Sequence, residues 1–168
     1  MSPRIRDLRE QDLPFLVAIE IAAGELFRKL GMDAVADDAP PTIGQLRVFS
    51  EAGQGWVAVD ADDLPVGYLI VEVVDGAAHI EQVSVHPSCA RLGNGRALIE
   101  QAQAWAVEDG LTAITLTTFT EVPWNGPYYV PLGFAYVEDI GPELAAIRAE
   151  EMRRGLDRWP RACMRKLL

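Results

Sequence analysis

The chain has 168 residues, of which 49% are hydrophobic, and a net charge of −10. This length and apolar fraction predict a single globular domain spanning residues 1–168 and exclude a disordered chain. The acidic balance argues against nucleic-acid binding, which needs a basic face to displace counterions from phosphates. No apolar stretch approaches the roughly 20 residues that cross a bilayer and the N-terminus is polar, so we expect no membrane association and a cytoplasmic location.

Apolar periodicity and turn residues predict a mixed α/β chain. Strands are expected at 5–8, 56–59, 66–74, 77–85, 113–119, from 132 onward and at 161–167, and helices at 12–30, 42–51, 95–107, within 121–131 and after Pro142. Asp12 is the expected N-cap of the first helix, Thr42 and Gln45 have the spacing of a capping box, and residues 33–41 are expected to form a loop. Asp75-Gly76 predicts a tight turn between antiparallel strands. We therefore expect a largely antiparallel central sheet flanked by helices.

Cysteine spacing and charge distribution restrict the chemistry. Cys89 and Cys163 form no CxxC pair, so we expect neither a disulfide framework nor a metal site. Residues 141–168 hold 7 basic and 4 acidic side chains, whereas residues 1–140 hold 8 and 21. This basic segment either neutralises an anionic ligand or pairs with the acidic remainder of the chain.

One segment joins a predicted strand to a predicted helix through a glycine-containing turn. Gly93 and Gly95 let a ligand approach the backbone, the helix N-terminus presents unpaired N–H groups, and Arg91 and Arg96 add positive charge. These features together favour a bound phosphate. In the alternative interpretation the glycines serve only the turn.

This turn resembles the best-known motif of the GNAT superfamily of acyl-CoA-dependent N-acetyltransferases. That motif is Gln/Arg-x-x-Gly-x-Gly/Ala after a strand ending in a Val-x-Pro-like turn, and Val85-His86-Pro87 and Gly93-Asn94-Gly95 match it. Downstream, the segment from Asn125 to Phe134 is similar to the second motif of the family, a tyrosine four residues before a Gly-Phe pair. The expected order of elements also agrees, so the resemblance covers almost the whole chain.

The resemblance implies that acetyl-CoA is the cosubstrate and that a primary amine attacks it directly in a ternary complex, without a metal. The amides of Val83 to Val85 would pair with the pantetheine arm, and the loop from Arg91 to Arg96 would bind the pyrophosphate. Tyr129 would be the general acid, with a structural tyrosine as the alternative. The implied cofactor-binding residues are Val83, Ser84, Val85, Arg91, Leu92, Gly93, Asn94, Gly95, Arg96, Asn125 and Tyr129.

The reaction also needs a base, because an alkylamine with a pKa of about 10 is mostly protonated near neutral pH. Glu81 lies two residues before Val83 on the same strand face, so it could accept the proton directly or through water. It could equally be a structurally paired carboxylate. His79 on the same face is a weaker candidate, because a partly buried strand histidine explains it as well.

Several positions depart from the family pattern. Ala90 occupies the first Gln/Arg position, Val122 replaces a frequent asparagine, and Thr117 replaces a glutamate base found in some relatives, so the role of base falls on Glu81. Pro131 is expected to end the short helix that carries Tyr129.

The acceptor side is the least defined part of the site. Relatives use the first helical pair and the segment between the last strands, which implicates Phe27, Met32, Glu81, Trp124 and residues 142–159. Acidic residues at 33, 37 and 38 would favour a cationic small-molecule or peptide amine, and the protein would be a monomer or a homodimer.

Two other classes of protein compete with this interpretation. A dinucleotide-binding domain would have a third glycine where Leu98 stands, and it would not begin with antiparallel strands. A non-catalytic module of the same fold that binds or senses acyl-CoA stays open.

Overall fold

The computed structural model describes residues 2–168, which divide into two compact units. Unit 1 comprises the residues up to Glu72 together with Glu81–Ala102, and unit 2 comprises Val73–Ile80 and Gln103–Leu168. The single domain that the sequence predicts stays a prediction.

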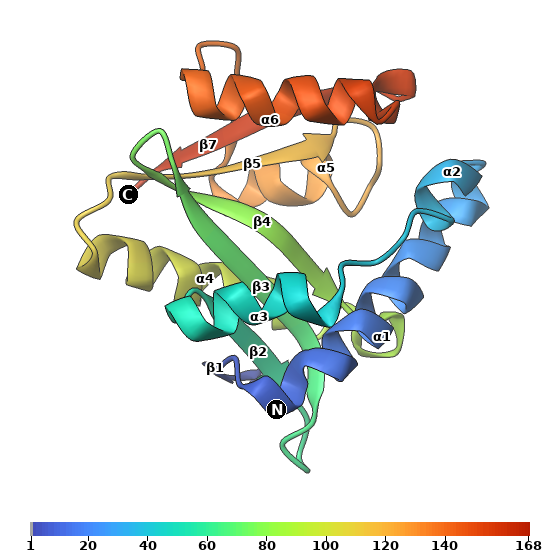
Figure 1. Cartoon of the computed structure of the whole chain (residues 1–168), viewed down its shortest axis with the longest axis vertical. Coiled ribbons are helices and arrows are strands. Elements are labelled where there is room, and N and C mark those ends of the chain that lie inside the picture. Colours follow the sequence, from blue (N-terminus) through green and yellow to red (C-terminus); the bar gives the residue numbers. More distant parts are fainter. Residues whose placement is uncertain (1) are drawn as a thin grey trace. The chain divides into compact units, whose positions relative to one another are not determined.

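Seven strands of residues 2–168 form a mixed, mostly antiparallel sheet, as predicted, although the strand expected from 132 onward begins at Ala135 because a 3-10 turn occupies Val130–Leu132. Their hydrogen-bonded order is β1-β2-β3-β4-β5-β7-β6 (Figure 1). Their bounds are Arg4–Asp7 (β1), Gly55–Val59 (β2), Pro65–Val74 (β3), Ala77–Val85 (β4), Ala113–Phe119 (β5), Ala135–Val137 (β6) and Arg161–Leu167 (β7). The pairing of β4 with β5 is parallel, and it joins Ala78 to Ile114 and His79 to Thr115.

The α-helices begin close to the predicted positions, with one addition, although the one predicted over 12–30 gives way to a 3-10 helix at Glu25–Leu30. They are Leu13–Gly24 (α1), Asp33–Ala36 (α2), Ile43–Ala52 (α3), Asn94–Glu108 (α4), Gly126–Tyr129 (α5) and Pro142–Arg153 (α6). The predicted capping box of α3 is confirmed, because Gln45 N donates to Thr42 Oγ1 at 3.1 Å and Thr42 N donates to Gln45 Oε1 at 2.9 Å. The prediction of a loop over 33–41 is wrong at its start. The N–H groups of Val35 and Ala36 bond back to the Met32 carbonyl and close the turn of α2 before the first proline is reached.

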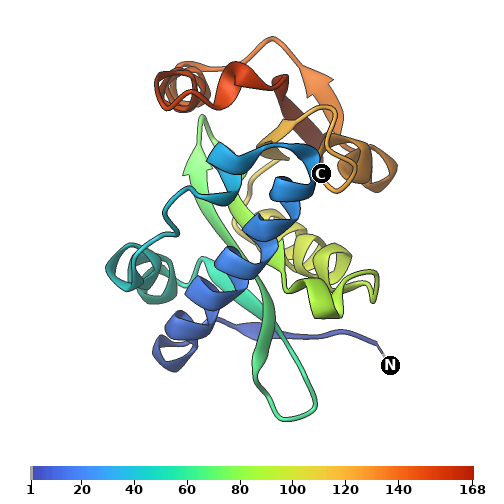
Figure 2. The ribbon, with the colours of Figure 1, turned by 90° about the vertical axis from the view of Figure 1, so that its right-hand side faces the viewer.

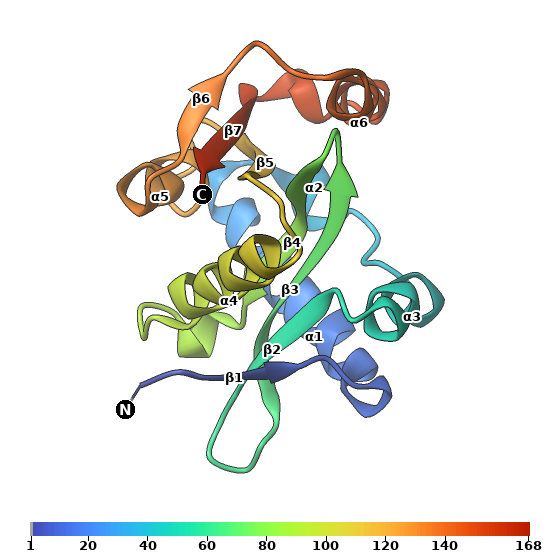
Figure 3. The same ribbon diagram turned by 90° about the vertical axis from the view of Figure 1, so that its left-hand side faces the viewer.

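The core of unit 1 lies between helices and the strands β2 and β3. Leucine and isoleucine side chains of α1 and Leu46 of α3 pack against Val57, Tyr68 and Ile70, and Figure 2 shows α1 running across these strands. The beginning of α4 lies on the opposite face, as Figure 3 shows. A Cβ at Gly67 would meet a Leu98 methyl group at 3.5 Å. Tyr68 therefore faces α1, while its neighbour Gly67 faces α4.

The junction of β1 and α1 corrects the predicted role of Asp12. Asp12 stands directly before α1, but its carboxylate makes no capping bond to the helix. It accepts instead from both terminal nitrogens of the Arg6 guanidinium, at 2.8 and 2.9 Å, and from Arg9 N at 2.8 Å. The reason is that a paired guanidinium is a stronger partner for a buried carboxylate than a single backbone N–H.

The core of unit 2 lies under α6. Leu144 packs against Val74 and Cys163, with Ile147 beside them. Asp75 and Gly76 have φ values of 50° and 75°, which confirms the predicted turn with positive φ at both central residues. The Asp75 carboxylate also accepts from Glu143 N at 3.0 Å and Leu144 N at 2.9 Å, so the turn caps the start of α6.

Within residues 2–168, Cys89 and Cys163 are both free thiols. No helix in this part of the chain is long and apolar enough to cross a bilayer.

Candidate functional site

The predicted phosphate loop of unit 1 follows an ordered turn at the end of β4. His86 N donates to the Val66 carbonyl at 2.8 Å, and the His86 ring Nδ1 accepts from Ser88 N at 3.1 Å. The Cys89 and Ala90 N–H groups bond back to His86 and Pro87. These bonds assign His86 to the turn, as the sequence indicated.

The loop itself has unusual backbone conformations. Gly93 has a φ of 86°, and Arg91 has a φ of 62°, which is uncommon for a residue other than glycine. Arg91 and Leu92 are both exposed. A non-glycine residue held in this region is disfavoured by about 1–3 kcal/mol, and such residues concentrate at binding and catalytic sites.

The loop ends at the N-terminus of α4. Asn94 is buried, and its Nδ2 donates to the Cys89 carbonyl at 3.2 Å, which fixes the start of the helix. The N–H groups of the first helical turn have no acceptor within the helix, so this end can bind an anion. Arg96 lies in that turn and pairs with exposed Glu100 at 3.0 Å. Because an exposed pair contributes about 0–1 kcal/mol, Arg96 can exchange this partner for a phosphate at little cost.

Tyr129 lies at the end of α5 in unit 2. It is 9% exposed, and its ring packs against Tyr128 and Phe134 with centroid distances of 5.3 and 5.9 Å. Burial, with a smaller contribution from Tyr128, raises the pKa of the Tyr129 phenol well above its usual value. The phenol is therefore protonated throughout the neutral pH range.

Asn125 and Pro131 define the ends of α5. Asn125 Oδ1 accepts from Thr118 Oγ1 at 3.1 Å, and the Asn125 carbonyl accepts from Tyr128 N at 2.8 Å. The α-helix ends at Tyr129 and continues as a 3-10 turn over Val130–Leu132. This confirms that Pro131 ends the helix.

The two base candidates from the sequence have different surroundings. Glu81 is exposed. His79 is buried, and its Nδ1 lies 2.9 Å from Thr115 Oγ1 on the neighbouring strand. This burial agrees with the interpretation of His79 as a strand histidine.

Another carboxylate, which the sequence did not single out, contacts β4 in unit 1. Glu20 on α1 accepts from Tyr68 Oη at 2.5 Å and from Ser84 Oγ at 2.9 Å. Burial raises the pKa of Glu20, although these two hydroxyl bonds oppose the shift. One sequence signal could have indicated it, because Glu20 is the only charged residue in Leu13–Gly24.

The expected acceptor-side residues differ in exposure. Met32 is buried in the core, whereas Phe27 in unit 1 and Trp124 in unit 2 are partly exposed. Arg28 bonds Asp37 at 2.7 Å and lies 3.8 Å from Asp33, so part of the acidic charge expected to draw a cation is neutralised locally.

Part of the basic C-terminal segment pairs with acidic residues of the same segment. Arg148 bonds Glu151 and Asp157 at 2.8 Å each, and Arg161 bonds Glu151 at 3.1 Å. Glu151 also accepts from Thr117 Oγ1 at 2.6 Å. The β5 position that carries a glutamate in some relatives thus holds a threonine bonded to a carboxylate from α6.

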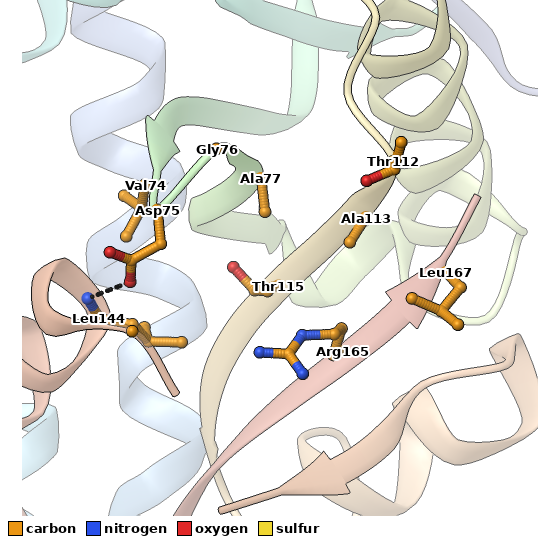
Figure 4. Close-up of a pocket in the computed structure, with 11 residues that line it drawn as sticks. Val74, Asp75, Gly76, Ala77, Thr112, Ala113, Thr115, Leu144, Arg165 and Leu167 are labelled. Atoms are coloured by element: carbon orange, nitrogen blue, oxygen red, sulfur yellow. Dashed lines mark hydrogen bonds between the residues drawn. The ribbon is translucent and has the colours of Figure 1, made fainter. Parts of the chain in front are cut away.

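Unit 2 contains an open cavity of about 320 Å³ between the Asp75-Gly76 turn, β5, β7 and the start of α6. Figure 4 shows the Arg165 guanidinium and the Thr115 hydroxyl within it. Its lining contains none of the residues that the sequence assigned to the cofactor or to catalysis. Among residues 2–168, no group of His, Cys, Asp or Glu has the arrangement of a metal site.

Comparison with known proteins agrees with these features. The model of the acetyltransferase (GNAT) family matches residues 13–134.

Three solved structures share the fold at low sequence identity. The PaiA N-acetyltransferase from Thermoplasma acidophilum in complex with coenzyme A is 16% identical, with a TM-score of 0.70 over 100% of both chains. A GNAT-family acetyltransferase from Staphylococcus aureus Mu50 is 13% identical, with a TM-score of 0.75 over 99% of both chains. The ribosomal-protein-S18-alanine N-acetyltransferase from Escherichia coli is 17% identical, with a TM-score of 0.68 over 99% of this chain and 94% of that one. Since the family model covers most of its length, the chain belongs to the GNAT family of acetyltransferases.

Proposed function

We propose that this protein transfers an acetyl group from acetyl-CoA to a primary amine by direct attack in a ternary complex. The phosphate loop is the observation that carries the proposal, because left-handed backbone at Arg91 and Gly93 leads directly into the N-terminus of α4. Family membership supports acyl transfer in general. The relative solved in complex with coenzyme A supports that cosubstrate.

The pantetheine arm and the pyrophosphate of acetyl-CoA each have candidate binding groups in the chain. The backbone amides of Val83 to Val85 would pair with the pantetheine arm as an added strand does. The first-turn N–H groups of α4 would bind the pyrophosphate, with Arg91 and Arg96 supplying charge. Because Ala90 has no polar side chain, backbone amides and these two arginines have to provide most of the binding.

The chemistry needs one proton acceptor and one proton donor. The amine nitrogen bonds to the thioester carbon, the amine loses a proton to a base, and the C–S bond breaks to release the thiolate of coenzyme A. An N–H of the central strand would stabilise the oxyanion of the intermediate, which is typically worth on the order of 3 kcal/mol. Tyr129 would donate its phenol proton toward the thiolate as the C–S bond breaks.

The raised pKa of Tyr129 determines whether the phenol would transfer its proton or only donate a hydrogen bond. The phenol retains its proton at neutral pH, so the acid is always in its active form. A thiol has an ordinary pKa of about 8.5, so complete transfer from such a phenol is unfavourable. Tyr129 would therefore stabilise the developing thiolate mainly through its hydrogen bond, without complete transfer of its proton.

The net charge of −10 favours cationic over anionic acceptors, in the form of a small amine or a peptide amine. The test is steady-state release of free thiol from acetyl-CoA in the presence of polyamines, amino acids, aminoglycosides and peptides. Exclusive activity on anionic acceptors would contradict the charge preference.

Replacement of the candidate acid tests the mechanism. Tyr129→Phe is expected to lower kcat on the order of 10²-fold, the lower end of what one general acid contributes, while the Kd for coenzyme A stays unchanged. Tyr136→Phe makes the same chemical change at an exposed tyrosine and should retain full activity. If Tyr129→Phe released thiol like the wild type across the pH range, Tyr129 would not be the acid. A wild-type protein that binds coenzyme A but releases no thiol with any amine would instead be a binding or sensing module.

A further inference from the structure

Glu20 is partly buried, its carboxylate is bonded to hydroxyl groups, and no Lys or Arg of the described residues pairs with it. The Tyr68 and Ser84 hydroxyls both donate to its Oε2, and Gln82 Nε2 in turn donates to Ser84 Oγ at 2.9 Å. Within residues 2–168, no Lys or Arg side chain bonds to Glu20 and no residue donates to Oε1. All four residues belong to unit 1.

Removal of a carboxylate from water is costly unless a cation or several hydrogen bonds compensate for it. Two hydroxyl bonds compensate only in part, since burial still raises the pKa of Glu20. Tyr68 from β3 is the titratable group that faces Glu20, and burial and the Glu20 charge raise the pKa of this phenol, so Tyr68 stays a neutral donor. An ionisable group whose pKa is shifted by desolvation and that lies beside a candidate binding strand is a candidate for a functional role.

The two faces of β4 separate Glu20 from Glu81. Ser84 faces α1, because its hydroxyl bonds to Glu20. Val85 faces α4. A Cβ added at Gly67 would meet both Val85 Cγ2, at 3.2 Å, and the Leu98 side chain of α4, so Val85 and Leu98 lie on the same side of the sheet. Alternation along the strand therefore puts Gln82 on the α1 face and Glu81 on the α4 face. The first helices, expected to line the acceptor side, are on the face of Glu20.

We propose that Glu20 is the base that accepts the proton of the attacking amine, with Tyr68 and Ser84 holding its carboxylate against the pantetheine-binding strand. This inference rests on the proposed acetyl transfer. As the N–C bond forms, the amine proton passes to Glu20 Oε1, directly or through one water. The C–S bond then breaks with its electron pair on sulfur, and the thiolate of coenzyme A leaves and takes a proton from solvent. Glu20 gives the amine proton back to solvent after the product departs, so the protons balance.

The test is the pH dependence of kcat/KM for the most rapidly acetylated amine in the screen above. Glu20→Gln is nearly isosteric and should lower kcat/KM on the order of 10²-fold at neutral pH. The deficit should shrink as the pH rises toward the pKa of the amine, because free amine then needs no base. Glu51→Gln makes the same change at an exposed carboxylate of α3 and should behave like the wild type.

A second variant distinguishes catalysis from structural support. Tyr68→Phe removes one hydrogen bond that stabilises the Glu20 carboxylate, so the acidic limb of the pH profile should move to higher pH. A merely structural role would lower activity equally at all pH values. Thermal unfolding and coenzyme A binding by calorimetry establish that each variant is folded.

The outcomes separate this inference from the proposed function. Absence of turnover by the wild-type protein would overturn both. Turnover by the wild type and by Glu20→Gln with the same pH profile would overturn the assignment of Glu20 alone. Loss of the acidic limb in Glu81→Gln, with Glu20→Gln unaffected, would identify Glu81 as the base.

Discussion

Replacement of Gly93 by alanine would test whether the loop before α4 holds the pyrophosphate. Gly93 has a φ of 86°, and an added Cβ would have Pro3 Cγ as its nearest neighbour at 3.5 Å, an ordinary van der Waals contact. Gly53, at the C-cap of α3, has a φ of 69° and would meet nothing within 4 Å. The two positions therefore share the same conformational penalty, but only Gly93 lies in the candidate site.

The penalty can be estimated from the backbone alone. An alanine in the left-handed region is disfavoured by about 1–2 kcal/mol, and the smaller entropy of the unfolded chain offsets about 0.4–1 kcal/mol of this. The free energy of unfolding should therefore fall by about 1 kcal/mol in Gly53→Ala. In Gly93→Ala the exposed loop can relax in the absence of ligand, so most of the penalty appears when coenzyme A binding restores the loop conformation, and the free energy of unfolding falls less. A cost of about 1–1.4 kcal/mol corresponds to a five- to tenfold higher Kd.

Urea denaturation and calorimetric titration with coenzyme A measure these two quantities. Gly53→Ala should lose stability but retain the wild-type Kd. Pantetheine, which lacks the phosphates, should bind wild type and Gly93→Ala equally. If Gly93→Ala bound coenzyme A as tightly as Gly53→Ala does, the loop would not be the pyrophosphate site.

Two further predictions concern stability. Asp12→Ala leaves the Arg6 guanidinium, 15% exposed, with the exposed Asp63 as its remaining carboxylate partner, and should lower the free energy of unfolding by about 3 kcal/mol in urea denaturation. A loss below about 1 kcal/mol, the range of surface pairs, would contradict this reasoning. The second follows from Glu20, whose pKa is raised in the folded state above 4.5, so the folded protein binds its proton more tightly than the unfolded chain does. The resulting stabilisation is complete below the unfolded pKa and is lost as the pH rises through the folded one. The free energy of unfolding of wild type minus that of Glu20→Gln should therefore fall with rising pH above about 4.5 and then level off; a difference that rises with pH would refute the raised pKa.

Features that depend on neighbouring residues were predictable from the sequence. The bounds of β4, β5 and β7, the capping box at Thr42 and the turn at Asp75-Gly76 all appear where they were expected. Each depends on side-chain alternation or on hydrogen bonds within a few residues, so the pattern contains the necessary information. The short helix α2 was missed because a four-residue helix has too few positions to show a period.

The partners of buried charged groups were decided by the tertiary structure. Asp12 has the spacing of a helix cap, yet the approach of Arg6 from β1 converts it into half of an ion pair. Thr117 gains a carboxylate from Glu151, which lies 34 residues away in the chain.

Within the candidate site, local sequence predicted the phosphate loop, whereas tertiary structure identified the candidate base. By itself the sequence determined the family motif, the loop from Arg91 to Arg96 and the tyrosine that follows, because these are contiguous patterns. Glu20 meets Tyr68 and Ser84 at separations of 48 and 64 residues, and its pKa depends on that burial. Only the folded chain brings the three together, since desolvation and hydrogen bonding across strands are properties of packing rather than of local sequence.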